Sequence, residues 1–198
     1  MLRFYCKNAS ADKQSSFDSL SLTVETVAFS ALRNQADTFD LLLFKNKTFM
    51  SRLQRFVTNS NYDHVGMVLR SSHNELFLFE CTSTYGVSVY TLDSFTRVNC
   101  KKYYERICYR KLGGHRTCQQ IVALERFVKE SIGKRYLFDP SYLLRSKGKS
   151  LEQEQTYFCS DLVAKALQEA GLLTLKHHSF QFLPSILCGE IRALLRRA

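Results

Sequence analysis

Short apolar segments separated by turns fill the middle of this chain, and they constrain its fold more than any other feature. The segment 40–44, in which residues 41–44 form a continuous apolar run, predicts a buried strand, and alternating apolar residues predict strands with one packed face. The alternating segments are 64–70, 75–81, 87–92 and 103–112. The polar turn Ser71–Asn74 and the glycine pair Gly113–Gly114 interrupt them. Strands joined by turns this short predict an antiparallel sheet.

Helical periodicity replaces this pattern in the last third of the chain. Thr117 followed by Gln120 is a capping-box pattern, and the apolar residues after it recur at spacings of three and four until Gly133. Further helices are predicted over 21–34, around 51–56, over 159–170 and from Pro184 onward. Strands followed by helices predict an α+β domain with an antiparallel sheet packed against helices.

The length of the chain favours a single domain. It has 198 residues, and domains hold about 150 residues each. We expect one domain over 1–198, with 1–18 as a loosely ordered N-terminal extension. Aromatic residues make up 13% of the chain, which excludes overall disorder. No apolar run approaches the roughly 20 residues that a membrane span requires.

The cysteines indicate a reducing compartment. There are seven of them, an odd number, and their spacing matches no zinc-binding doublet. The N-terminus lacks an apolar signal core. We therefore expect a cytoplasmic protein that needs no metal and no cofactor.

The net charge of +10 favours anionic partners such as nucleic acid or phospholipid headgroups. The basic residues are scattered, however, and no nucleic-acid-binding motif accompanies them. One interpretation is a solvated surface, and the other is a weak preference for anionic membranes that fades as salt increases. We predict no nucleic-acid partner, and the sequence predicts no oligomeric state.

Cys159 is the strongest candidate nucleophile. It lies where a polar loop meets an apolar helix, and the positive end of the helix dipole favours the thiolate. Ser160 and Asp161 add polarity to the first turn. The alternative is a buried structural cysteine. Cys81, in a predicted strand, is interpreted as a packing residue.

His64 is the candidate base, because it begins an alternating strand and a strand holds a side chain rigidly. The remaining histidines are expected in exposed turns and loops: His73, His115, His177 and His178. The alternative for His64 is a core histidine that is hydrogen-bonded to the backbone.

Glu80 is the candidate partner of that histidine. It shares a strand face with Leu76 and Leu78, so its carboxylate points into the packed side and requires a partner there. A hairpin turn centred near residue 72 would place His64 directly opposite Glu80. The alternative is a structural ion pair between Glu80 and an arginine.

Several short motifs in this order resemble the permuted papain-like cysteine hydrolases, the YiiX-like branch of the NlpC-type superfamily, which includes a poxvirus member. The motifs are Asp40-Leu41-Leu42-Leu43-Phe44, His64-Val65-Gly66-Met67-Val68, Phe79-Glu80, Gly133-Lys134-Arg135-Tyr136 and Phe158-Cys159-Ser160-Asp161-Leu162-Val163-Ala164. The resemblance runs from about Asp40 to Pro184. The family often has Gly-Asp where this chain has Phe39-Asp40.

The resemblance implies a circularly permuted papain-like fold with a small sheet or barrel against helices. It also implies a triad of Cys159, His64 and Glu80 that acts through an acyl-enzyme on amide or ester bonds. The substrate would be a peptide, an amide or a lipid ester. Two alternatives stay open: acyl transfer to or from a lipid, as a lipid acyltransferase or thioesterase, and a non-catalytic assembly subunit.

Overall fold

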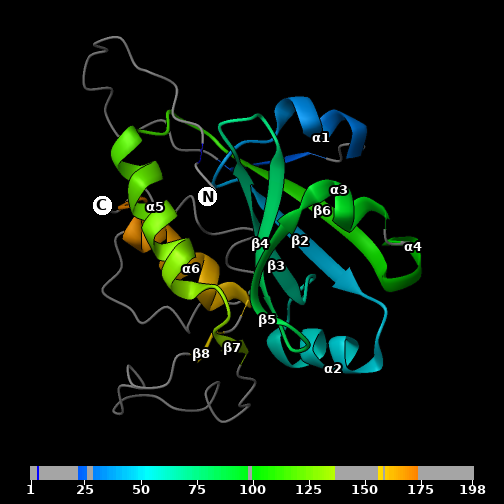
Figure 1. Cartoon of the computed structure of the whole chain (residues 1–198). Coiled ribbons are helices and arrows are strands. Elements are labelled where there is room, and N and C mark those ends of the chain that lie inside the picture. The colour runs from blue at the N-terminus through cyan, green and yellow to red at the C-terminus, as the bar shows by residue number, and fades with distance from the viewer. Residues whose placement is uncertain are drawn as a thin grey trace.

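Figure 1 shows the computed structural model of the chain, which describes residues 4, 22–25, 29–97, 100–136, 156–157 and 159–173. The strands are β1 Leu22–Glu25, β2 Leu41–Asn46, β3 His64–Arg70, β4 Leu76–Thr82, β5 Gly86–Thr91, β6 Tyr104–Leu112, β7 Arg135–Tyr136 and β8 Thr156–Tyr157. The helices are α1 Phe29–Gln35, α2 Phe49–Thr58, α3 Leu92–Arg97, α4 Cys100–Tyr103, α5 Cys118–Ser131 and α6 Cys159–Glu169.

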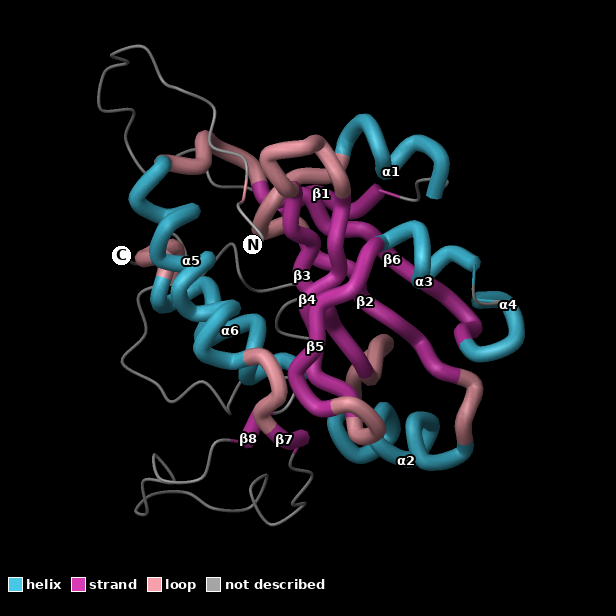
Figure 2. The backbone as a smooth tube through the Cα atoms, viewed as in Figure 1, coloured by secondary structure: helices cyan, strands magenta, loops and turns pink. Residues whose placement is uncertain are grey.

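An antiparallel sheet of six strands, in the order β1-β6-β2-β3-β4-β5, forms the centre of the molecule. Helices α5 and α6 lie on one side of it, and α1, α3 and α4 lie on the other, as the tube in Figure 2 shows. The short strands β7 and β8 form a separate parallel pair beside the start of α6. The predicted α+β class, with an antiparallel sheet against helices, is confirmed.

Each face of the sheet has its own core, because alternate residues of every strand point to opposite sides. Leu41, Met67 and Phe79 pack against α5 and α6 on one face. Leu42, Val68 and Leu78 pack on the other face, against Leu32 of α1 and Phe95 of α3. The sheet is therefore a middle layer with both faces covered.

Two helix predictions can be compared directly with the structure. The capping box at Thr117 is confirmed, because its hydroxyl accepts from the Gln120 N–H while Gln120 accepts from the Thr117 N–H. The helix predicted over 21–34 is wrong at residues 22–25, where β1 pairs with β6 and Leu22 lies opposite Leu112. The hydrogen-bonding groups along the open edge of β6 outweigh a weak helical periodicity there.

Two predictions concern residues outside the described part of the chain: the N-terminal extension 1–18 and the helix from Pro184 onward. Phe4 is the described exception. It is buried and forms a bridge with Ser71, so at this residue the extension packs against the domain. In the described residues, no helix is both long and apolar enough to cross a bilayer.

Among the cysteines that the structure describes, one differs from expectation. Cys118 is disulfide-bonded, whereas Cys81, Cys100, Cys108 and Cys159 are free thiols. A disulfide is unusual in a reducing compartment. It therefore counts against the reasoning that led to a cytoplasmic location, and the compartment stays a prediction.

The buried carboxylate of Asp40 links the start of β2 to the end of β6, at the end of this strand pair that is away from α2. Asp40 accepts from the Tyr109 hydroxyl at 2.6 Å, the Leu112 N–H at 2.8 Å and Arg116 Nη2 at 2.7 Å. Burial raises the pKa of Asp40, although the Arg116 charge and these hydrogen bonds oppose the shift. Phe39 before it is fully buried with φ of 75°, a conformation that favours glycine.

Candidate active site

Cys159 is the first residue of α6, and the packing of that helix determines where its sulfur lies. Leu162, Val163 and Ala166 are fully buried against the sheet, so the helix cannot rotate without losing core contacts. Cys159 is itself 4% exposed. The N-terminus of α6 thus holds the thiol against β3 and β4, at the sheet end where His64 begins β3.

His64 and Glu80 form the best-defined contact of the site. His64 Nε2 lies 2.7 Å from Glu80 Oε2, and both side chains are mostly buried. The ring also hydrogen-bonds with Cys159. Since Nε2 is occupied by the carboxylate, Nδ1 is the nitrogen available to the sulfur. The structure therefore brings the candidates Cys159, His64 and Glu80 together.

The charges around His64 favour the imidazolium. Burial alone lowers the pKa of His64, but the negative charges of Cys159 and Glu80, with hydrogen bonds to both, raise that pKa well above its ordinary value. Burial likewise acts to raise the pKa of Glu80, and the His64 charge with hydrogen bonds from His64 and Tyr90 lowers it overall. The two shifts describe a carboxylate–imidazolium pair next to the sulfur.

Tyr90 is a site residue that the sequence analysis missed. Its hydroxyl donates to Glu80 Oε1, the oxygen that His64 leaves free. Burial and the Glu80 charge raise the pKa of Tyr90, so the phenol stays protonated and can donate. Alternation along β5 could have revealed it, because Tyr90 and Ser88 share a face and Ser88 lies opposite Glu80.

The register of β3 and β4 differs from the predicted one. Met67 lies opposite Phe79 and Arg70 opposite Leu76, so continuing the ladder places Gly66, not His64, opposite Glu80. The turn is centred one residue later than expected, with a hydrogen bond from the Ser71 N–H to the Glu75 carbonyl. His64 and Glu80 therefore meet diagonally across the two strands, on the same face.

Gly66 makes that diagonal contact feasible. A Cβ at this position would lie 2.8 Å from Leu78 Cδ1 and 3.3 Å from Glu80 Cβ. Leu78 is fully buried and has little room to move. The absence of a side chain at Gly66 leaves space for Glu80 to reach along the face to His64.

The residue before His64 secures the start of β3. The Asp63 carboxylate accepts from the Asn46 N–H at 3.0 Å and pairs with Arg55 of α2. The Asp63 N–H donates to the Phe44 carbonyl at 3.0 Å. The Phe44 ring packs on the His64 ring with centroids 5.4 Å apart. The backbone at the start of β3 and the imidazole ring of His64 are thus both held in place.

The remaining thiols and histidines lie outside this constellation or are poorly suited to its chemistry. Cys81 is fully buried, and burial with the nearby charges of Cys159, Glu80 and Asp161 raises its pKa to about 12. His73 and His115 are exposed, while His177 and His178 lie outside the described residues. Among the side chains that the structure describes, no group of three or more His, Cys, Asp and Glu could hold a metal ion.

The fold and its chain order define a class. The strand that carries His64 comes before the helix that carries Cys159, and this chain has a circularly permuted papain-like fold. Residues 40–183 match the family described as permuted papain-like amidase enzyme, YaeF/YiiX, C92 family. Since the match spans most of the chain, the protein belongs to this family, whose papain-like class supports a cysteine-type hydrolase.

One solved structure illustrates the likeness. The metalloprotein yiiX from Escherichia coli O157:H7 superposes with a TM-score of 0.53 at 22% identity, covering 80% of this chain and 82% of that chain. At that identity the likeness concerns the fold alone. No curated protein matches the sequence.

Proposed function

We propose that this protein hydrolyses amide or ester bonds through a Cys159–His64–Glu80 triad and a covalent acyl-enzyme. The observation that carries the proposal is the position of the His64 ring, which hydrogen-bonds Glu80 Oε2 at 2.7 Å and also Cys159. Family membership supports an amidase-type hydrolase, and the geometry supports the role proposed for each of the three side chains.

Cys159 is the nucleophile in this mechanism. His64 accepts the thiol proton, and the thiolate attacks the substrate carbonyl carbon to form a tetrahedral oxyanion. The Cys159 backbone N–H lies at the N-terminus of α6, where the helix dipole stabilises developing negative charge.

His64 then acts as the acid. The imidazolium returns its proton to the leaving amine or alcohol as the carbonyl re-forms, which leaves a thioester on Cys159. Water, deprotonated by the now neutral His64, attacks the thioester and releases the carboxylic acid. Glu80 keeps the ring oriented and compensates its positive charge in both steps, as the acid does in serine triads.

Trapping the acyl-enzyme tests this proposal. We would screen p-nitrophenyl esters and anilides of varied acyl length, and measure the intact mass of the protein quenched during turnover. The expected result is turnover with a mass increase equal to the acyl group, located on Cys159 by peptide mapping. Cys159→Ala should abolish both signals, whereas Cys100→Ala, which removes a half-buried free thiol, should keep them.

Two outcomes would count against the proposal. Turnover that survives in Cys159→Ala would mean a different nucleophile. An absence of both turnover and adduct across the panel would favour the non-catalytic alternative on the same fold.

A further inference from the structure

Helix α2 presents its apolar side to solvent. Phe49 is 77% exposed, Met50 63%, Leu53 47% and Phe56 84%. These residues recur at spacings of three and four and so occupy one side of the helix, which we call the outer face of α2. Half of the strongly exposed large hydrophobic residues in the described part of the chain lie on this single helix. Such clustering marks an interaction surface, whereas scattered exposed apolar residues do not.

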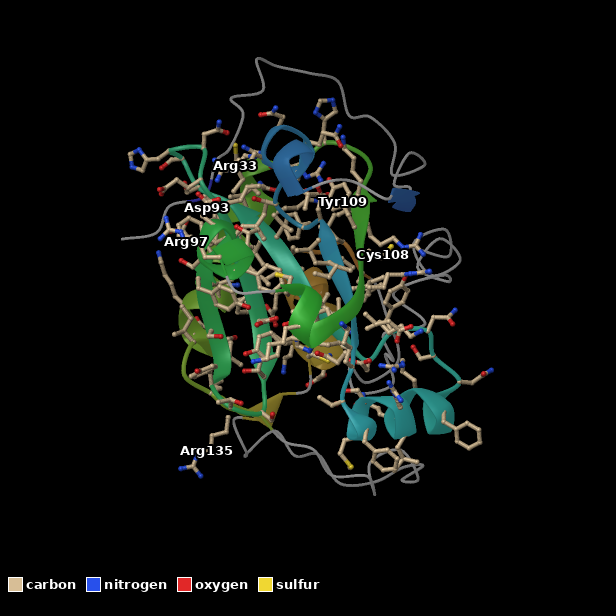
Figure 3. All side chains as sticks on the ribbon, turned by 90° about the vertical axis from the view of Figure 1, so that its right-hand side faces the viewer. Arg33, Asp93, Arg97, Cys108, Tyr109 and Arg135 are labelled. Atoms are coloured by element: carbon tan, nitrogen blue, oxygen red, sulfur yellow. The ribbon has the colours of Figure 1, made fainter. Side chains whose placement is uncertain are left out.

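The polar side of α2 faces the protein, which is the reverse of an ordinary surface helix. Arg55 is 8% exposed, pairs with Asp63 and donates to the Asn46 carbonyl at 3.0 Å. Gln54 Nε2 donates to the Asp63 carbonyl at 3.3 Å. These polar contacts keep the helix from turning its phenylalanines inward. In Figure 3 the side chains on the outer side of α2 project away from the sheet.

The helix is also well defined at both ends. The Thr48 side chain caps its N-terminus by accepting from the Ser51 N–H. Asn59 ends it in the left-handed conformation, with φ of 47°. A capped helix of 10 residues is about 15 Å long. The helix that carries the outer face is therefore already formed, and burial of this face requires little further loss of backbone freedom.

The surroundings of the outer face are basic. Residues 45–58 include Lys45, Lys47, Arg52 and Arg55 and contain no acidic residue. Lys47 and Arg52 are exposed. The neighbouring carboxylate, Glu105, is paired with Lys45 at 2.8 Å.

Helix α4 extends the same surface. The Lys47 N–H donates to the Tyr103 carbonyl at 3.0 Å, which places the end of α4 beside the start of α2. Tyr103 is 49% exposed, and Lys102 Nζ lies 5.5 Å from its ring centroid. Tyrosine and lysine with exposed apolar bodies and polar tips suit the boundary between lipid and water.

We propose that the outer face of α2 docks on anionic phospholipid membranes, with Phe49, Met50, Leu53 and Phe56 inserted below the headgroups and Lys47, Arg52 and Lys102 on the phosphates. A basic amphipathic helix with aromatic and aliphatic residues on its apolar side lies in the plane of a bilayer interface. The overall charge of +10 adds long-range attraction to such a surface. This inference does not depend on the hydrolase mechanism.

Helix α2 contacts the residue that directly precedes the candidate base His64. Arg55 and Gln54 of α2 both bind Asp63, and His64 is the next residue. Docking through α2 therefore brings the start of β3, and with it the candidate triad, toward the membrane surface.

Vesicle co-sedimentation tests the surface. The protein is mixed with vesicles of phosphatidylcholine alone, or with 30% phosphatidylserine, at 0.1 and 0.5 M NaCl. Wild type should bind the phosphatidylserine vesicles at 0.1 M salt and keep measurable binding at 0.5 M, because salt screens charges and leaves apolar insertion in place. Binding that vanishes completely at 0.5 M salt, or that is equal on both lipids at 0.1 M, would overturn the proposal.

Variants separate insertion from charge. Phe49→Ser/Phe56→Ser should weaken binding about tenfold or more at both salt concentrations. Arg52→Gln should weaken it about fivefold at low salt and little at high salt. The matched control is Val122→Ser, which removes a residue that is 65% exposed on α5 and should bind as wild type does. Equal loss in the control and the Phe variant would mean that α2 is not the surface.

Two further measurements separate the membrane proposal from the hydrolase proposal. Cys159→Ala should bind vesicles as wild type does, and the Phe49→Ser/Phe56→Ser variant should keep its activity on soluble esters. Failure of one proposal is therefore distinguishable from failure of the other. If wild type is a dimer by sedimentation equilibrium and the Phe variant is a monomer, with no vesicle binding by either, the face is a self-association surface and the membrane proposal is wrong.

Fluorescence measures the insertion directly, because the chain contains no tryptophan. Phe56→Trp creates a single reporter on the outer face, whose emission should shift to shorter wavelength with vesicles and be quenched by brominated acyl chains. Val122→Trp should show neither effect. An unchanged Phe56→Trp spectrum in the presence of bound vesicles would exclude insertion at this position.

Discussion

The hydrogen bond between His64 and Glu80 lies at the centre of the candidate site, and its surroundings make it more than an isolated surface pair. Glu80 is 5% exposed, its two oxygens bind different partners, and those described partners are His64 and Tyr90 rather than an arginine. A buried carboxylate without its cation would be costly. Each member of the group therefore depends on the others for its charge state.

Replacing Glu80 by Gln should keep the shape of the site and remove its charge. We expect kcat/KM to fall about 10- to 100-fold, the range for losing a hydrogen bond to a charged group. Without the Glu80 charge the pKa of His64 decreases, so the alkaline limb of the pH–rate profile should move to lower pH. That limb reports the loss of the imidazolium that protonates the leaving group.

The stability of the same variant has a defined pH dependence. The pKa of Glu80 is lowered by folding and that of His64 is raised. The Glu80 contribution is present above its ordinary value of 4.5 and is lost as pH falls, and the His64 contribution is present below 6.5 and is lost as pH rises. The difference in melting temperature from wild type should therefore be largest between these values. A shifted melt with an unchanged pH–rate profile would remove Glu80 from the triad.

Tyr90→Phe tests the second hydrogen bond to Glu80. Removal of the hydroxyl leaves Oε1 unpaired, which raises the pKa of Glu80 and weakens its pairing with His64. We expect kcat/KM to decrease by roughly tenfold with an altered pH profile. Tyr104→Phe is the matched control, because the Tyr104 ring also packs near the site, on Phe44. Equal effects of the two changes would assign Tyr90 to packing alone.

At the scale of elements, the β3–β4 hairpin and the start of α6 assemble the site. The hairpin was predictable because alternation and turn residues are local signals, and its strand ends agree with the predicted ranges within one residue. The register of the hairpin was not predictable, because the turn is centred one residue later than expected. A turn centre shifted by one residue changes the residue opposite any given position by two along the strand. The face of the sheet on which Glu80 lies was predicted correctly, since a shift of two residues leaves each side chain on the same face.

Gly66→Ala should show how tightly the hairpin is built. The added methyl group meets the buried Leu78 side chain and the Glu80 Cβ, so we expect a loss of about 1–3 kcal/mol in unfolding free energy. Because Glu80 is one of the two side chains that the added methyl group meets, the alkylation rate of Cys159 should also decrease. The matched comparison is Thr117→Ala, which removes the cap of α5 and costs about 1 kcal/mol. It should spare the alkylation rate, and equal chemical effects of both changes would contradict a special role for Gly66.

At the scale of the whole molecule, the order of the strands and the orientation of α2 were beyond the sequence. The order depends on which distant strand covers the open edge of β6, and the segment 22–25 carries no local signal for that choice. The outer face of α2 follows the usual rule of helical periodicity, but the rule predicts an inward apolar side. The polar contacts of Arg55 and Gln54 with Asp63 reverse it. Charge alone predicts weak, salt-sensitive membrane association, and the docking proposed for this face would add an apolar component.

The two cores share one sheet, so we propose that the chain is a single domain and unfolds as a unit. Loss of the α5–α6 layer would expose the face with Met67 and Phe79, and the opposite layer would lose its support on the same strands. Near- and far-ultraviolet circular dichroism should give coincident thermal transitions. Two separated transitions would mean that the layers are independent units.

Alkylation of Cys159 tests the central claim most directly. Free thiols in the folded protein are labelled with iodoacetamide at pH 6 and pH 8, and the rate at each cysteine is followed by mass spectrometry. Burial keeps two of the competing thiols protonated, since it raises the pKa of Cys81 to about 12 and also raises the pKa of Cys100. The account predicts that Cys159 reacts first at both pH values and that His64→Ala slows it most at pH 6, where the imidazolium is needed to hold the thiolate. Modification of another cysteine first, or a Cys159 that is inert in the folded protein, would contradict the assignment of the nucleophile.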